Sequence, residues 1–229
     1  HHLSKVSFVS LPSSFLNCST LPAMRAKSML RFAVVLSSLF IATLPADGAR
    51  ITTCFVPGED CTGRIVREID KADEEVLVQA YGFTSCAIIE ALLRAKQRGL
   101  VVGVLLDRSN EQRRYAGTIV TLHANGIAPK IDHRPSTYVA PDGSERTRGI
   151  AHIKAIILDR RMVITGSMNF TWCGQHCNVE NVLFVSVKRT AREHVSNWRQ
   201  REALARNPTI AAGIMPACAA AATKSSFAN

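Results

Sequence analysis

Apolar residues after position 49 follow two different spacings, one helical and one strand-like. Positions three and four residues apart are apolar in segments 62–73 and 85–98, which predicts amphipathic helices. The runs 76–81 and 100–106 are short and almost continuously apolar, as expected of buried strands. A strand, a helix and a strand in this order indicate a βαβ unit with parallel strands.

The alternation of helix and strand continues through the second half of the chain. The further elements predicted are a helix over 112–124, strands over 127–131, 151–158, 162–165 and 179–187, and a closing helix over 190–205. The expected fold class is therefore α/β, with a mixed, mostly parallel β-sheet flanked by helices on both faces. Residues 133–149, with their prolines and the Asp142-Gly143 turn signal, are expected to form a loop, and residues 208–229 a loosely ordered tail.

The amino-terminal part resembles a targeting segment rather than part of the fold. Met24 is the first plausible start, so residues 1–23 are expected to be a non-native upstream segment. Basic residues after Met24, an apolar run over 32–44 and a small-residue exit over 45–49 are typical of a secretory signal peptide at 24–48. The apolar run is shorter than the roughly 20 residues of a membrane span, although an uncleaved anchor is the alternative. The sequence thus predicts export, periplasmic or secreted, with no stable membrane span after signal removal.

The chain is strongly basic. It holds 28 Lys and Arg residues against 18 Asp and Glu, a formal net charge of +10, and most of the surplus lies after residue 48. Such a surplus favours an anionic partner, namely nucleic acid, phospholipid headgroups or another polyanion, although it can also serve solubility alone. With 47% hydrophobic residues, the composition excludes a wholly disordered or collagen-like protein.

Cysteines are frequent in the expected mature chain. They are Cys54, Cys61, Cys86, Cys173, Cys177 and Cys218. In an oxidising compartment disulfides are the default, and Cys54 and Cys61 bracket a turn-rich stretch that could close a short loop. Cys173 and Cys177 enclose His176 and suit either a second disulfide or a metal site, but a zinc site needs a second half that the sequence lacks. Disulfides are therefore favoured over zinc, and their pairing stays open.

A histidine and a lysine stand out in an otherwise apolar predicted strand. His152 and Lys154 are two residues apart and project from one face, while Ile153, Ala155 and Ile157 are expected to point the other way into the core. A polar pair at such a position is costly unless it serves a function.

A second group of polar residues follows the next predicted strand. Gly166 allows the chain to bend there, which presents Ser167 and Asn169 from a loop at the strand end. An imidazole, an ammonium, a hydroxyl and an amide together suit a phosphate, because lysine and asparagine can hold its oxygens while histidine attacks phosphorus. No cluster of carboxylates accompanies them, so a metal-dependent nuclease fits poorly.

The spacing His-x-Lys-x₄-Asp followed by Gly-Ser-x-Asn is far more specific than His-x-Lys alone. It resembles the HKD motif of the phospholipase D superfamily, which the chain matches at His152, Lys154, Asp159, Gly166, Ser167 and Asn169. The likeness runs from about Thr53 to Trp198 and is strongest with short, exported bacterial endonucleases that carry one motif per chain. Segments 78–84, 95–99 and 178–181 also resemble that branch. The resemblance implies a phospholipase D-like catalytic domain over 49–207.

The resemblance also implies a homodimer with a shared active site, because members of the superfamily need two motifs in one site. His152 of one subunit would attack the phosphodiester and form a phosphohistidine, while the other His152 would protonate the leaving oxygen and later activate water. Lys154 and Asn169 of both subunits would stabilise the transition state, with Ser167 hydrogen-bonding in the same site. Neither a metal nor another cofactor is implied.

Two acidic residues complete the implied site. Glu180 matches the acid that holds the nucleophilic imidazole by its far nitrogen. Asp159 matches the motif but follows a predicted strand at a turn, so we expect it to support structure more than chemistry.

Three functions remain open at this point. A nonspecific, metal-independent endonuclease on DNA or RNA is favoured, because basic residues suit a phosphate backbone and no element resembles a base-reading helix. The residues expected to bind this substrate are Arg113, Arg114, Arg134, Arg146 and Arg148, with Lys130 beside them. A secreted phospholipase D acting on phosphatidylcholine-type lipids is the alternative, although segment 133–149 offers only Tyr138, Val139 and Ala140 for acyl chains. A noncatalytic anion-binding relative is the third, and the intact motif argues against it.

Overall fold

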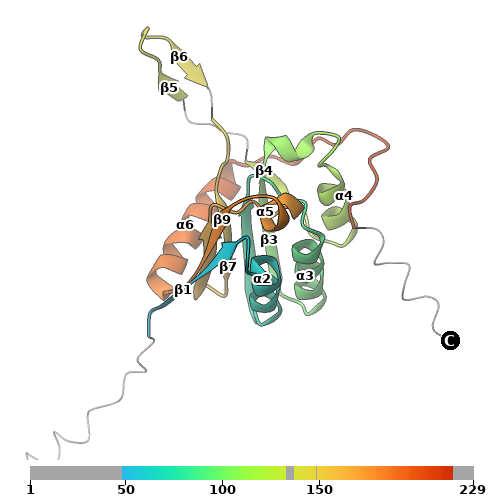
Figure 1. The fold of residues 1–229 in the computed structure, drawn as a ribbon. Helices are drawn as coiled ribbons and strands as arrows, with labels where there is room; N and C mark the ends of the chain where they lie inside the picture. Colours follow the sequence, from blue (N-terminus) through green and yellow to red (C-terminus); the bar gives the residue numbers. More distant parts are fainter. Residues whose placement is uncertain (1–47, 133–136, 148, 219–229) are drawn as a thin grey trace, which may run out of the picture. The chain divides into compact units, whose positions relative to one another are not determined.

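A single seven-stranded sheet organises the part of the chain that the computed structural model describes, residues 48–132, 137–147 and 149–218 (Figure 1). The strand order is β1-β9-β8-β7-β2-β3-β4. The strands are β1 (Arg50–Val56), β2 (Glu75–Ala80), β3 (Val101–Asp107), β4 (Lys130–Asp132), β7 (Lys154–Leu158), β8 (Met162–Gly166) and β9 (Glu180–Ser186).

The sheet is mixed, but the expectation that it is mostly parallel was wrong. Only β2–β3 and β3–β4 are parallel, and the other four neighbouring pairs are antiparallel. The parallel pair β2–β3 confirms the predicted βαβ unit. Two of the four antiparallel pairs follow from single features of the chain. A tight turn at Asp159 and Arg160, both with positive φ, folds β8 back on β7, and the unpredicted strand β1 adds a pair with β9.

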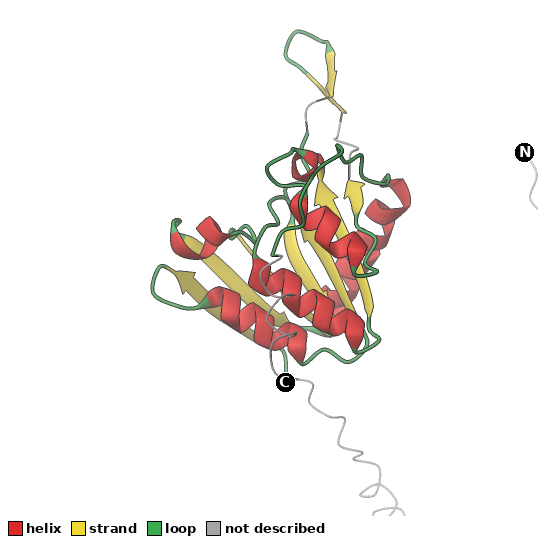
Figure 2. Ribbon diagram, turned by 90° about the vertical axis from the view of Figure 1, so that its right-hand side faces the viewer, coloured by secondary structure: helices red, strands yellow, loops and turns green. Residues whose placement is uncertain are grey.

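Helices cover both faces of the sheet, as expected (Figures 1 and 2). α2 (Cys61–Asp70), α3 (Cys86–Gln97) and α4 (Gly117–Ala124) lie on one face, and α6 (Lys188–Leu204) lies on the other. Alternate residues of each central strand serve the two layers: Val76 and Val78 of β2 join the first core, whereas Leu77 packs with Trp198 of α6 in the second. Burial on both faces explains why these strands are continuously apolar.

Most predicted elements are present with shifted ends. The helix predicted over 112–124 begins only at Gly117, because a 3₁₀ turn, η1 (Arg108–Glu111), and further turns come first. The strand predicted over 151–158 begins at Lys154. α5 (Trp172–His176), a helix of a single turn, was not predicted.

Residues 137–147 form a hairpin inside the segment predicted to be a loop. β5 (Thr137–Val139) pairs antiparallel with β6 (Glu145–Thr147). The turn signal was correct, since Gly143 has a φ of 77° and the Asp142 carboxylate accepts the Ser144 backbone N–H at 3.0 Å.

All six cysteines of the described residues are paired, as Cys54–Cys61, Cys86–Cys218 and Cys173–Cys177. Disulfides were thus the correct expectation for Cys173 and Cys177, and the zinc alternative was wrong. Cys86–Cys218 also corrects the expectation of a loose tail for residues 208–218. That segment is attached to α3 by the disulfide and to α4 by the Ala217 N–H, which donates to the Gly117 carbonyl at 3.0 Å.

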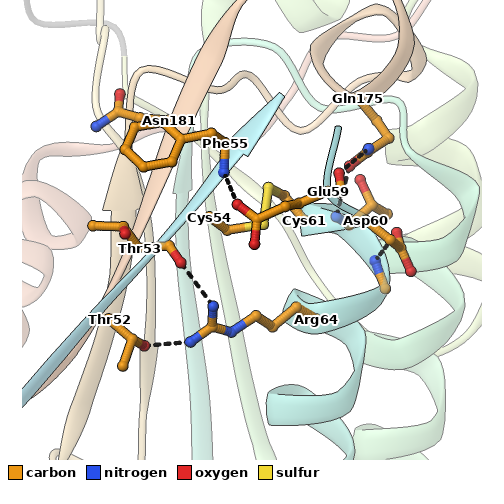
Figure 3. The surroundings of a disulfide bond; sticks show 12 residues. Thr52, Thr53, Cys54, Phe55, Glu59, Asp60, Cys61, Arg64, Gln175 and Asn181 are labelled. Atoms are coloured by element: carbon orange, nitrogen blue, oxygen red, sulfur yellow. Dashed lines mark hydrogen bonds between the residues drawn. A yellow bond between two sulfur atoms is a disulfide. The ribbon is translucent and has the colours of Figure 1, made fainter. Parts of the chain in front are cut away.

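The Cys54–Cys61 disulfide ties edge strand β1 to the start of α2 (Figure 3). Around it, the Glu59 carboxylate accepts the Phe55 N–H at 2.7 Å and Arg64 donates to the Thr53 carbonyl at 2.8 Å. These contacts occupy backbone groups on the outer edge of β1, where an uncovered edge would otherwise invite pairing with another chain.

The expected upstream segment 1–23 and, apart from Gly48, the signal peptide 24–48 lie outside the described residues, as do residues 219–229. Among the helices that are described, none is long and apolar enough to cross a membrane.

Gly103 makes room on β3 for the ring of Trp198. A Cβ atom at Gly103 would lie 2.6 Å from ring atoms Cη2 and Cζ2 of Trp198 and 3.0 Å from Leu77 Cδ2. The Trp198 ring is held in place, because its indole N–H donates to the Val78 carbonyl at 3.0 Å and its side chain is only 3% exposed.

We expect Gly103→Ala to lower the free energy of unfolding by about 1–3 kcal/mol, because the core has no space for the added methyl group. Urea denaturation measures the change. In a Trp198→Phe background, which lacks Cη2 and Cζ2, the same substitution should cost clearly less. An equal cost in both backgrounds would contradict the packing argument.

Candidate active site

Most of the candidate residues lie at one end of the central strands, which we call the active-site edge of the sheet. β7 begins there with Lys154, β8 ends there with Gly166 and β9 begins there with Glu180, because these three strands run antiparallel to one another. The carboxyl end of β2 lies at the same edge, since Ala80 pairs with Lys154. Residues that are far apart in the sequence therefore meet at one end of the sheet.

His152 lies just before β7 and is exposed. Its ring meets the Tyr81 ring edge-on, with centroids 4.7 Å apart and an interplanar angle of 62°. The Tyr81 backbone is itself fixed, because its N–H donates to the Ile153 carbonyl at 3.1 Å and its carbonyl accepts from Asn110 Nδ2 at 2.6 Å. The imidazole is thus accessible but lies against a ring of fixed position.

Lys154 is a mostly buried lysine, since the residue as a whole is only 7% exposed. Its Nζ donates to the His152 carbonyl at 2.9 Å and lies 5.4 Å from the Tyr81 ring centroid. Burial lowers the pKa of the Lys154 ammonium below the ordinary lysine value, and the Glu180 carboxylate opposes this shift by favouring the charged form. A poorly hydrated cation of this kind interacts strongly with an incoming anion.

Ser167 and Glu180 form a hydrogen-bonded pair at the end of β8. Gly166 has a φ of 149°, and a Cβ atom there would lie 2.2 Å from the Asn181 carbonyl oxygen, so the position requires glycine. Ser167 Oγ donates to the Glu180 carboxylate and accepts the Asn181 N–H at 3.0 Å. Glu180 also accepts from Asn178 Nδ2 at 2.8 Å.

The expected contact between Glu180 and the nucleophilic imidazole differs from what the structure contains. Within the described part of one chain, the carboxylate hydrogen-bonds to Ser167 and Asn178 and makes no hydrogen bond to His152. The strand register explains the observed partner, because Ser167 follows β8 next to the first residues of β9.

Asn169 lies in the loop after β8, half-buried beside Gly82. This loop is fastened to the loop after β2: the Phe170 N–H donates to the Gly82 carbonyl at 3.1 Å, and the Thr84 and Ser85 N–H groups donate to the Phe170 carbonyl at 2.9 Å. The Oδ1 atom of Asn169 is buried and has no hydrogen-bond partner among the described residues. Unsatisfied buried groups are costly and therefore uncommon, so this one marks a specialised position.

Asp159 is not part of this cluster. It lies beyond the opposite end of β7, in the left-handed region with a φ of 50°. Its carboxylate accepts the backbone N–H groups of Asp73, Glu74 and Glu75 at 3.0, 2.8 and 3.0 Å. This geometry corrects the place of Asp159 among the catalytic candidates. It agrees with the expectation that Asp159 supports structure more than chemistry.

Two of the five arginines expected to bind substrate can be placed. Arg113 and Arg114 are exposed in the turns after η1, and Arg114 lines the same cavity as Asn169. The side chain of Arg146, on β6, and all of Arg134 and Arg148 lie outside the described part. Lys130 on β4 has its Nζ 3.9 Å from the Glu202 carboxylate.

Tyr81 and Asp107 were missed as site residues. Tyr81 touches both His152 and Lys154, as described above. Asp107, 2% exposed at the end of β3, accepts the Ser109 and Ala151 N–H groups at 2.8 Å each and so fixes the segment that leads into His152. Their position directly after apolar strands was the available signal, because ligand groups gather at carboxyl ends of strands.

The described residues contain no group of three or more His, Cys, Asp or Glu side chains close enough together to hold a metal ion. The chemistry available at this edge is therefore that of an accessible imidazole beside a buried ammonium, with a hydroxyl and an amide nearby. Such a set can attack and stabilise a phosphorus centre.

Comparison with known proteins gives a consistent result. Residues 65–201 match the family described as "Cardiolipin synthase, PLD-like domain". A protein named Phospholipase D from Rickettsia felis (strain ATCC VR-1525 / URRWXCal2) is 39% identical over 155 residues, 68% of this chain and 70% of that protein.

Solved structures agree in fold. The crystal structure of a phospholipase D family member, Nuc from Salmonella typhimurium, has a TM-score of 0.61 and 27% identity, covering 71% of this chain and 99% of that one. NucT from Helicobacter pylori has a TM-score of 0.60 at 21% identity over 69% of this chain and 99% of that one, a likeness of fold.

We expect Glu180→Gln to lower the pKa of the Lys154 ammonium further, because the substitution removes the carboxylate that favours the charged form while burial persists. Since the ammonium then loses its proton at lower pH, its NMR titration in selectively labelled protein should move towards acid. Glu193→Gln, which changes a carboxylate of the neighbouring helix α6, is the matched control and should leave the curve in place. An unchanged titration in Glu180→Gln would contradict the electrostatic effect of Glu180 on the Lys154 ammonium.

Proposed function

The chain belongs to the phospholipase D superfamily and is a phosphodiester hydrolase, and from this premise we propose that it is a metal-independent, nonspecific endonuclease acting on nucleic acid. The observation that carries the proposal is the buried Lys154 ammonium beside the accessible His152 imidazole, near the exposed cations Arg108, Arg113 and Arg114. Together with a net charge of +10, these cations suit a chain of phosphates better than a single headgroup.

In the proposed reaction, an imidazole nitrogen of His152 attacks phosphorus, and the bond from phosphorus to the leaving oxygen breaks. The partner's His152 gives its proton to that oxygen. Water then attacks the phosphohistidine, gives a proton to the partner's His152, and the N–P bond breaks to release the phosphate monoester. Lys154 and Asn169 hold the nonbridging oxygens as charge develops on them.

In this scheme, Ser167 and Glu180 act on the reaction indirectly, through Lys154. Glu180 favours the charged form of Lys154, which burial disfavours, and the hydrogen bond from Ser167 holds the carboxylate in that position. Asp159 serves the fold by fixing the turn between β7 and β8 to the backbone before β2.

A homodimer follows from the same chemistry. One chain supplies one His-x-Lys sequence, whereas the reaction needs an attacking imidazole and a proton donor on opposite sides of phosphorus. A second copy that meets the first at the His152 edge would supply the missing group, so the site would be complete only in the dimer.

Export is proposed on two grounds. The segment 24–48 has the pattern of a signal peptide, and all six cysteines that follow it are paired, which is characteristic of proteins from oxidising compartments.

Hydrolysis of phosphatidyl lipids is the second candidate. The side chains of Ile150 and Ile153 are 53% and 41% exposed on either side of His152, and apolar groups beside the site would suit acyl chains. The relative from Rickettsia felis carries the name Phospholipase D.

The test compares plasmid DNA, a single-stranded oligonucleotide and phosphatidylcholine vesicles as substrates in excess EDTA. We expect both nucleic acids to be cleaved. His152→Ala should lower the rate by at least about 10²–10⁴-fold, because nucleophile and proton donor are lost together. His123→Ala, an exposed histidine on α4, is the control and should keep full activity.

Three results would contradict parts of this proposal. Cleavage of vesicles but not of nucleic acid would make the protein a lipid hydrolase. Loss of activity in EDTA with recovery in Mg²⁺ or Zn²⁺ would end metal independence. Full activity of His152→Ala would remove His152 from the reaction.

Mixing experiments test the shared site. Wild-type chains are mixed with His152→Ala chains, unfolded with intact disulfides and refolded together. We expect the activity to be proportional to the square of the wild-type fraction, because mixed dimers lack one imidazole. His194, which lines the same hollow as His152, is the obvious candidate for a proton donor within one chain. A linear dependence on the wild-type fraction, together with inactivation by His194→Ala, would favour such a monomeric site.

A further inference from the structure

A cavity of about 230 Å³ opens next to the candidate active site. Its walls come from the end of β2, from η1 with the turns behind it, and from the loop after β8. Two of its lining residues, Tyr81 and Asn169, belong to the site already described. Since the Tyr81 ring also touches His152, the cavity lies one side chain away from the imidazole.

The wall of the cavity is fixed before any ligand arrives. Asn110, 2% exposed, donates through Nδ2 to the carbonyls of Tyr81 and Asp107 at 2.6 and 3.0 Å, and its Oδ1 accepts the Phe83 N–H at 3.2 Å. Thr118 Oγ1 donates to the Phe83 carbonyl at 2.8 Å. A cavity with such walls loses little conformational entropy when it is filled.

The far side of the cavity carries an aromatic ring and a guanidinium group in contact. The Arg114 guanidinium carbon lies 4.6 Å from the Tyr115 ring centroid, and Arg114 Nη2 donates to Gln112 Oε1 at 3.1 Å. Planar groups of this kind stack with the bases of single-stranded nucleic acid, and Arg adds a cation–π contribution. Ser109 and Gln112 line the same cavity with groups that can bond the polar edge of a base.

A second hollow adjoins the first along a shared rim. Tyr81, Ser109 and Gln112 line both. The second hollow adds Arg108, the buried Asp107, and Glu111 in an ion pair with Arg206. Arg108 is exposed and makes no ion pair with the described residues, so it can meet another phosphate. The two hollows together form one groove, which runs from the aromatic cavity near the candidate active site to the Arg108 cation.

We propose that this cavity is a nucleobase subsite, in which Tyr115 and Arg114 stack on an unpaired base next to the scissile phosphodiester. The proposal rests on the proposed function and narrows it, because a base inside a duplex is already stacked on its neighbours. The preferred substrate is therefore single-stranded or locally opened nucleic acid. An acyl chain is a poor occupant, since it would leave the hydroxyl and amide groups of the lining without hydrogen bonds.

Binding measurements on the inactive His152→Ala protein in EDTA test the subsite at constant salt concentration. The probes are a fluorescent oligothymidine and an abasic chain of equal length, which presents the same phosphates without bases. We expect oligothymidine to bind about tenfold more tightly, as stacking of one base predicts. Adding Tyr115→Leu should remove this preference and leave abasic binding unchanged, whereas Tyr115→Phe should retain it.

Phe55→Leu, which changes an exposed aromatic residue on β1, is the matched control and should keep the preference. Thermal melts show whether each variant is folded. If Tyr115→Leu does not fold, Tyr115→Phe is the variant whose binding is compared with that of the parent protein. Equal binding of both probes, or a preference that survives Tyr115→Leu, would overturn the subsite and leave the endonuclease proposal intact. Failure to bind either probe would overturn the endonuclease proposal and the subsite with it.

Discussion

A mostly buried lysine, Lys154, at one end of the strands of an apolar sheet, sets the main constraint on this structure. Removing a cation from water is costly unless polar groups replace its hydration. The His152 carbonyl, the Tyr81 ring and the Glu180 carboxylate provide that replacement. Each of these groups comes from a different strand end, so the ammonium is stable only where β2, β7 and β9 meet. The antiparallel arrangement of β7, β8 and β9 is therefore a requirement of the site as well as a feature of the fold.

The parts of the structure that were predicted from sequence are those with a local cause. Apolar periodicity predicted α2, α3 and the parallel pair β2–β3. The spacing from His152 to Asn169 predicted that polar residues gather at one end of the sheet, because residues on one short hairpin keep their neighbours. β1 was missed because it is an edge strand with alternating exposure, which lacks the continuous apolar run of a central strand. The excess of antiparallel pairs was missed because it depends on that strand and on the pairing of β7 with β2, which lie far apart in the sequence.

Other features depend on contacts between distant residues, which a single sequence does not reveal. Cys86 and Cys218 are 132 residues apart, and only the folded chain brings them together. Asp107 resembled the ordinary end of a strand until its carboxylate was seen to accept the Ala151 N–H, 44 residues away. Glu180 was expected to bond an imidazole, whereas its hydrogen-bond partners in this chain include Ser167, which strand register places next to it.

The Cys86–Cys218 disulfide gives the protein a closed covalent ring. The backbone from α3 onwards, including β7, β8, β9 and α6, returns through two sulfur atoms to the first residue of α3. A protease that cuts this ring once produces a new pair of chain ends but no separate fragment. The strands β7, β8 and β9, which carry the candidate catalytic residues, and helix α6 would then remain parts of one molecule. Under the proposed export, where proteases are common and a cleaved protein is not resynthesised, this topology would keep a singly cut chain in one piece.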